Sequence, residues 1–196
     1  MRGYRAGSMK YVKLLDGGLV DNFGLSGFTI ALESAQAPYE PLARAEALRL
    51  HRILFLVVDS GRGPQGNWAD RLEGPSGAGL VDAVSSAAID ASVRASFTAF
   101  NAELAAWRDS LVRWRCSLAA AEVTRALGAN HHWNCRDIKV FVGRLSFDQL
   151  DAARASRLSA VPTRFNLPAA TIDELISAGE DALAASPTFR DFKRSL

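Results

Sequence analysis

Arg52-Ile53-Leu54-Phe55-Leu56-Val57-Val58-Asp59 is the stretch that decides the fold of this chain. It is an unbroken apolar run, rich in β-branched and aromatic side chains, between one basic and one acidic residue. A run of this length without polar alternation is typical of a strand that is covered on both faces, as strands of parallel sheets are. The stretch therefore predicts an α/β domain.

The sequence downstream of this strand alternates between helical and extended patterns. Glycines and prolines predict a long loop over about 60–79, and the absence of both residues predicts one long helix, or two in succession, over about 80–127. A second strand is expected at 137–142, a short helix at 147–158, and a closing helix at 171–185 followed by a polar tail.

Upstream, the same alternation continues. Apolar residues at helical spacing predict a helix from about Leu25 that stops before Pro38, and 42–50 predicts a second, short one. Residues 9–15 end in an aromatic and aliphatic run that predicts another buried strand. Alternation of this kind indicates a layered α/β domain.

One carboxylate lies where that first strand breaks. Gly17 and Gly18 cannot extend a strand without cost, so the chain turns there and leaves Asp16 at the rim of the sheet. Open α/β sheets carry their chemistry at this rim, outside the carboxyl ends of the strands. An aspartate that merely caps the turn is the structural alternative.

The surrounding string, Leu14-Leu15-Asp16-Gly17-Gly18-Leu19-Val20-Asp21-Asn22-Phe23-Gly24, resembles the second catalytic block of the patatin-like phospholipase family. The segments 161–168 and 172–179 resemble the closing part of bacterial members. The resemblance implies a layered α/β/α sheet and a Ser–Asp dyad without histidine. Asp16 matches the catalytic aspartate, Gly17 and Gly18 match the motif glycines, and Leu19 to Asn22 fit the usual extension.

The family's nucleophile is not found. Members carry a Gly-x-Ser-x-Gly elbow and a glycine-rich oxyanion loop upstream of the aspartate, whereas the fifteen residues before Asp16 contain neither. Ser26, Ser60 and Ser76 each lack at least one of the two required glycines and are expected to be ordinary loop or cap residues. Residues 1–196 are therefore expected to be the C-terminal portion of one acyl hydrolase domain, with an incomplete sheet and no esterase turnover of its own.

The resemblance implies a lipid or ester substrate, possible peripheral contact with a membrane, and dependence on a missing N-terminal segment of the same domain; it implies no cofactor and no metal. The alternative is a catalytically dead remnant or an interaction module on the same scaffold, offering a helical seam to a partner. Such a seam is predicted within the long helix, where packing against the sheet is its structural explanation. Its members are Phe97, Phe100, Leu104, Trp107, Leu111, Trp114 and Leu118.

Composition fits an ordinary globular domain. The chain has 196 residues, of which 48% are hydrophobic, and its net charge of +2 is too small to indicate nucleic-acid binding. No apolar run approaches the roughly 20 residues that span a bilayer, and the first residues, which no apolar core follows, are not expected to act as a signal peptide. The bacterial cell envelope is a possible location for an intact parent protein.

Two further groups of residues have alternative explanations. The run Gly61-Arg62-Gly63-Pro64-Gln65-Gly66 matches a dinucleotide-binding pattern, but prolines and glycines after it oppose the helix that this site requires. Cys116 and Cys135, near His131 and His132, could form a disulfide in an exported protein, remain thiols in a reducing compartment, or ligate zinc. His51 is expected at the surface.

Overall fold

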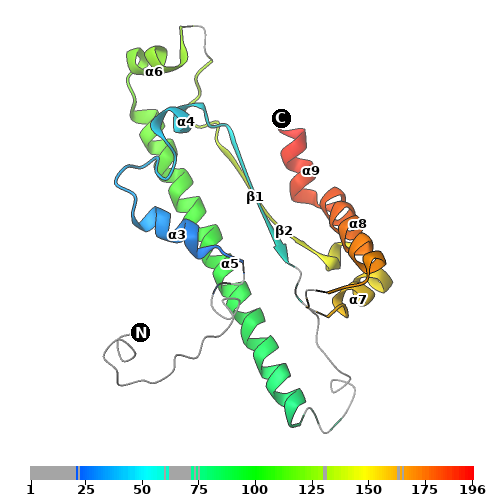
Figure 1. Ribbon diagram of the computed structural model, residues 1–196. Helices are drawn as coiled ribbons and strands as arrows, with labels where there is room; N and C mark the ends of the chain where they lie inside the picture. Colours follow the sequence, from blue (N-terminus) through cyan, green and yellow to red (C-terminus); the bar gives the residue numbers. More distant parts are fainter. Residues whose placement is uncertain are drawn as a thin grey trace, which may run out of the picture.

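The structure of the protein is a computed structural model, shown in Figure 1. It describes Asp21, residues 23–59, Gly61, Leu72, Gly74, 76–129, 132–162, Arg164 and 166–196.

Two parallel strands form the sheet of the described part of the chain. Strand β1 (Arg52–Asp59) pairs along its whole length with β2 (Lys139–Ser146), in a register that places Arg52 beside Lys139 and Asp59 beside Ser146. The apolar run therefore forms the predicted strand within a parallel sheet. The chain has mixed α/β content, as the sequence indicates.

Helices occupy both faces of this sheet (Figure 1). In chain order they are α3 (Ser26–Glu33), α4 (Arg44–Arg49), α5 (Ala78–Ser117), α6 (Ala120–Leu127), the 3-10 turn η2 (Phe147–Gln149), α7 (Ala152–Ser159), α8 (Ala169–Ala185) and α9 (Pro187–Arg194).

The stretch 80–127 forms two helices in succession, one of the two predicted alternatives, since the backbone is extended at Leu118 and Ala119. Two other helix predictions need correction. The expected helix 147–158 is interrupted, because Asp151 accepts a hydrogen bond from the Arg154 amide at 2.9 Å and starts α7 anew. The predicted polar tail is instead α9, which begins with Pro187 after the capping side chain of Ser186.

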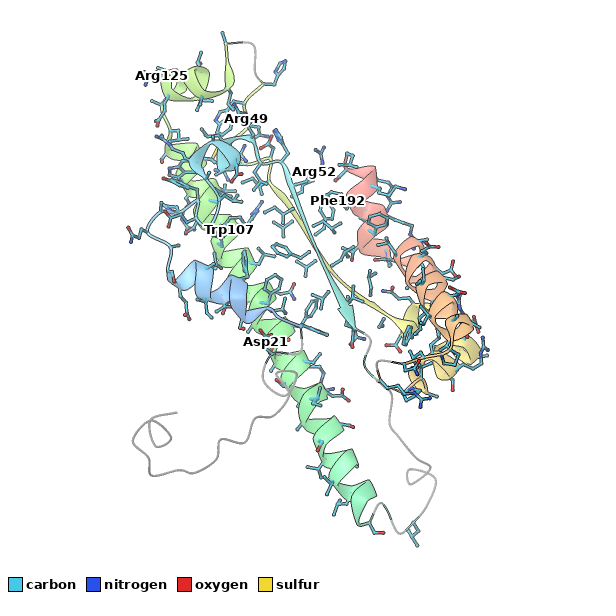
Figure 2. All side chains as sticks on the ribbon, viewed as in Figure 1. Asp21, Arg49, Arg52, Trp107, Arg125 and Phe192 are labelled. Carbon is cyan, nitrogen blue, oxygen red and sulfur yellow. A yellow bond between two sulfur atoms is a disulfide. The ribbon has the colours of Figure 1, made fainter. Side chains whose placement is uncertain are left out.

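The main core lies between α5 and one face of the sheet. Phe100, Leu104, Trp107 and Leu111 are buried there and contact Ile53, Phe55, Val140 and Val142 of the strands. From α3, the ring of Phe28 packs edge-on against Phe55, Phe100 and Trp107, with ring centroids 5.4 to 6.1 Å apart. The Trp107 indole N–H donates to the Glu40 carbonyl at 2.7 Å (Figure 2).

This packing decides how the apolar seam of α5 is used. The buried members of the seam cover the sheet, so they are not available to a partner or a lipid surface. The structural explanation of the seam is therefore confirmed for its four buried members, Phe100, Leu104, Trp107 and Leu111. Leu118 lies beyond the end of α5.

On the opposite face, α8 and α9 cover the strands. Phe141 of β2 meets Phe192 of α9 at 5.6 Å between ring centroids (Figure 2). Gly143 of β2 allows the start of α9 to come close, because a Cβ at this position would lie only 2.9 Å from the Thr188 side chain and 3.1 Å from Leu56.

Candidate functional site

The predicted catalytic aspartate, Asp16, and the motif glycines Gly17 and Gly18 lie outside the described residues. The structure does describe the carboxyl ends of β1 and β2, which is the rim where the chemistry of an open α/β sheet is expected. The site is therefore built here from the residues of that rim and from Asp21, the part of the motif that is described.

Asp59 closes β1 at the rim and is held on two sides. Its carboxylate accepts the Gly61 N–H at 2.9 Å and pairs with the Arg144 guanidinium at 3.3 Å. A Cβ at position 61 would lie 2.8 Å from the Asp59 Oδ1, so a larger residue there would require the Asp59 carboxylate to shift. Asp59 thus already has a cation and an amide as partners.

Arg144 extends this cluster to the end of β2. Its second guanidinium nitrogen lies 3.2 Å from Asp148, to which the Ser146 hydroxyl also donates at 3.2 Å. Gln149 donates from its side-chain amide to the Arg144 carbonyl at 2.7 Å. Arg144 thus forms ion pairs with Asp59 at the end of β1 and with Asp148 just after β2, so it links the two strand ends. The rim has two carboxylates and one cation in this cluster.

Asp21 organises the helix that follows the motif. Its carboxylate accepts the backbone amides of Leu25 at 2.9 Å and Ser26 at 3.0 Å, and it also accepts the Ser26 hydroxyl. The Ser26 hydroxyl is the main reason that the pKa of Asp21 lies below its ordinary value; partial burial opposes the shift, and the backbone amides add to it. A carboxylate with a lowered pKa and three donors is a helix cap rather than a general base.

The serines that the structure describes were expected to be loop or cap residues and not nucleophiles. Ser26 is the first residue of α3 and follows a turn rather than a strand, unlike the serine of a nucleophile elbow; Ser76 lies just before α5. Ser60 lies outside the described residues, as does most of the Gly61–Gly66 pattern.

The two cysteines are joined as a disulfide between Cys116, near the end of α5, and Cys135, in the loop before β2. Their sulfurs are therefore not zinc ligands in this structure. His132 is exposed and His131 lies outside the described residues. Across the described ranges, no group of three histidine, cysteine or acidic side chains is placed to hold a metal ion.

A buried polar network beside the disulfide was not predicted. Arg115 is fully buried and donates to the Leu50 and Asn134 carbonyls at 2.6 and 3.2 Å and to Asp137 at 2.8 Å. The Asp137 carboxylate also contacts His51 Nδ1 at 2.7 Å, so His51 is half-buried rather than a free surface residue.

Burial lowers the pKa of the Arg115 guanidinium, and the charge and hydrogen bond of Asp137 oppose that shift. The guanidinium also lies over the Trp133 ring, 4.4 Å from its centroid. The sequence does contain one indication that Arg115 is buried. It follows Leu111 by four residues and therefore lies on the same, apolar face of α5. The network joins α5 to the segments that lead into both strands, and we therefore assign it a structural role.

No helix within the described ranges has both the length and the apolar composition needed to cross a bilayer. Comparison of the chain with protein-family models, with curated proteins and with solved structures finds no match.

Proposed function

We propose that this chain is the aspartate-bearing part of a patatin-like lipid acyl hydrolase, in which Asp16 acts as base for a serine from outside these 196 residues. The observation that carries the proposal is the Asp16-Gly17-Gly18 turn directly after an apolar run. The described part of the motif adds support, because Asp21 fixes the start of α3 immediately downstream.

The chain topology supports a position for Asp16 at the sheet rim. Helix α3 packs on the same face of the sheet as α5, since Phe28 contacts both Phe55 and Phe100. Strand–helix–strand crossovers in parallel sheets are right-handed. Two successive crossovers whose helices lie on the same face of the sheet, here those through α3 and α5, therefore place the three strands in chain order across the sheet. A strand at 9–15 would then extend the sheet beyond β1, with Asp16 beside the Asp59–Gly61 turn.

The proposed reaction is acyl transfer through a covalent intermediate. The serine oxygen attacks the ester carbonyl while Asp16 accepts its proton, and Asp16 then returns that proton to the leaving alcohol. In the second half, water attacks the acyl carbonyl and loses a proton to Asp16, and the ester bond to the serine then breaks as Asp16 returns the proton to the serine oxygen. Because an ordinary aspartate has a pKa near 4, the base needs partial desolvation and close contact with the serine.

The test compares the chain alone with a protein extended upstream through a Gly-x-Ser-x-Gly segment. We expect no hydrolysis of p-nitrophenyl butyrate by residues 1–196, and covalent labelling of the extended protein by a fluorophosphonate. Asp16→Asn is expected to lower the labelling rate by roughly 10²- to 10⁴-fold, the usual contribution of a positioned base. Asp173→Asn, on the exposed side of α8, is the matched control.

Labelling that is unchanged in Asp16→Asn contradicts the dyad. An in-frame stop codon immediately upstream of Met1 supports the non-catalytic scaffold instead.

A further inference from the structure

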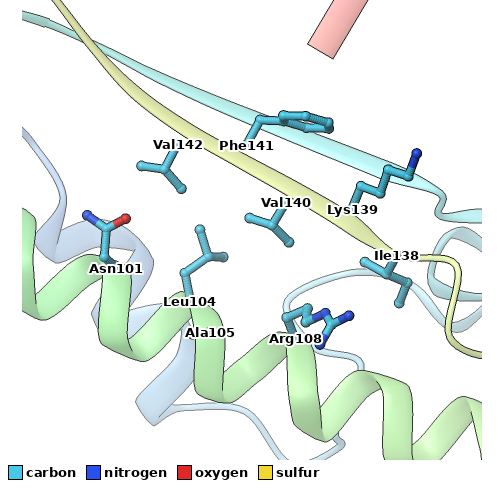
Figure 3. A pocket seen from close by; sticks show the side chains of 9 residues that line it. All are labelled: Asn101, Leu104, Ala105, Arg108, Ile138, Lys139, Val140, Phe141 and Val142. Atoms are coloured by element: carbon cyan, nitrogen blue, oxygen red, sulfur yellow. The ribbon is translucent and has the colours of Figure 1, made fainter. Parts of the chain in front are cut away.

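The outer edge of β2 borders an open groove. The groove has a volume of about 520 Å³ and lies between the first half of β2 and the middle of α5 (Figure 3). Val140 and Val142 point from the strand toward α5, where Leu104, Ala105 and Arg108 form the opposite wall (Figure 3). We call this feature the β2 groove.

Backbone groups of β2 are unpaired along this groove. The Lys139 amide donates to the His51 carbonyl at 2.9 Å, and the N–H and C=O groups of a strand point to alternate sides. The groups of Val140 and Val142 therefore point away from β1, and none of the residues that the structure describes bonds to them. The Arg144 carbonyl, next in this series, is already bonded to Gln149.

The amino-terminal end of the groove is cationic on both faces of the strand. Arg108 lies on the α5 side, and Lys139 projects to the opposite side (Figure 3). Arg108 is paired only with its exposed neighbour Asp109, and Lys139 has no ion pair within the described ranges. Residues 138–142 include no acidic side chain that could balance these charges.

We infer that the β2 groove binds an extended peptide segment of a partner protein, added as a strand to the edge of β2. A peptide backbone satisfies the outward groups of Val140 and Val142, which an acyl chain cannot do. Alternate apolar side chains of the segment contact Val140, Val142 and Ala105. Two successive acidic residues, one on each face of the added strand, meet Arg108 and Lys139.

A second copy of this chain fits the groove less well. Pairing the first halves of two β2 edges would add Lys139 and Arg108 of the second copy to the cations already present, with no carboxylate from 138–142 to oppose them. Charged residues on an edge strand commonly prevent such self-association. Because the groove lies along the first half of β2, away from the carboxyl rim, this inference does not depend on the proposed hydrolase activity.

The experiment uses the whole chain and a fluorescent peptide, acetyl-Asp-Glu-Val-Thr-Val-Glu-Asp-amide, whose acidic pairs at both ends allow either strand direction. Fluorescence polarisation measures binding, and amide NMR signals of Val140 and Val142 locate it. Ala105→Phe, which fills the groove from α5, is expected to abolish binding, whereas Ala106→Phe on the same helix is not. Arg108→Glu is expected to weaken binding about tenfold or more through loss of a charged contact, and Arg113→Glu is its control.

Backbone methylation of the peptide separates strand addition from nonspecific contact. Methylating the alternate amides that face β2 is expected to abolish binding, and methylating the other set is expected to leave it. Equal affinity of both methylated peptides overturns the proposal. Displacement of the peptide by dodecanoate at equal concentration, or a dimer of the chain that Ala105→Phe dissociates, overturns it in favour of an amphiphile or a second copy.

Discussion

At the scale of single residues, Arg115 is the side chain on which the local structure depends most. Replacing it with methionine keeps much of the volume, leaves Asp137 without its arginine and with only the His51 contact, and leaves two backbone carbonyls without their donor. We expect Arg115→Met to lower the free energy of unfolding by about 3 kcal/mol, since removing one partner of a buried pair leaves the other uncompensated. Urea denaturation measures this change.

The control for this prediction is Arg113→Met, two residues away on the exposed side of α5. Its effect is expected to stay within about 0.5 kcal/mol, as for most surface substitutions. Adding Asp137→Leu to Arg115→Met is expected to recover part of the loss. Equal effects of the two arginine substitutions would show that the network does not stabilise the fold.

Asp21 gives a second prediction at this scale, on pH. Its pKa is lowered in the folded protein, so its contribution to stability is present above the unfolded pKa of about 3.9 and is lost as pH falls through the lower folded value. Ser26→Ala removes the main donor and is expected to raise the pKa of Asp21 toward its ordinary value. Carboxyl-carbon NMR titration tests this, with Ser34→Ala, whose hydroxyl bonds to the Ile30 carbonyl, as control.

At the scale of elements, two glycines predict opposite outcomes for the same substitution. Gly143→Ala forces a methyl group against Thr188 and Leu56, so we expect a loss of about 1–3 kcal/mol from overpacking. Gly179→Ala adds its methyl to α8 with nothing within 4 Å, so we expect a gain of up to about 1 kcal/mol from helix propensity. Thermal unfolding of both variants decides, and a stabilising Gly143→Ala contradicts the close approach of α9.

How far each element could be predicted follows from its apolar pattern. The bounds of β1 match the sequence prediction because the apolar run coincides with the paired segment. Strand β2 continues past the predicted end at 142, since Gly143 and Arg144 stop the apolar run while the ladder with β1 goes on. Helix α9 was missed because Pro187 suggests an end and few of its side chains are apolar; the contact of Phe192 with β2 could not be known from local pattern.

The residues of the candidate site also differ in how far local sequence identifies them. Asp16 is identified by a local motif, and the cap function of Asp21 follows from contacts within five residues. The burial of Arg115 depends on Leu50, Asn134 and Asp137, which are remote in sequence, and a charged residue on an apolar face predicts exposure by default. The spacing of apolar residues within one helix or strand cannot predict polar contacts between residues so far apart in the sequence.

At the scale of the whole molecule, the Cys116–Cys135 disulfide links the crossover helix α5 to the entry of β2. The linked positions are 19 residues apart, and a closed loop of this size is expected to stabilise the fold by about 3 kcal/mol, chiefly by restricting the unfolded chain. Reduction by dithiothreitol should therefore lower the free energy of unfolding by that amount. Cys116→Ser/Cys135→Ser should already lack this contribution and should not respond to the reductant, because it has no disulfide to lose. A double variant as stable as the oxidised protein would contradict the role of this crosslink, and would leave the apolar core and the Arg115 network as the contacts that hold α5 on the sheet.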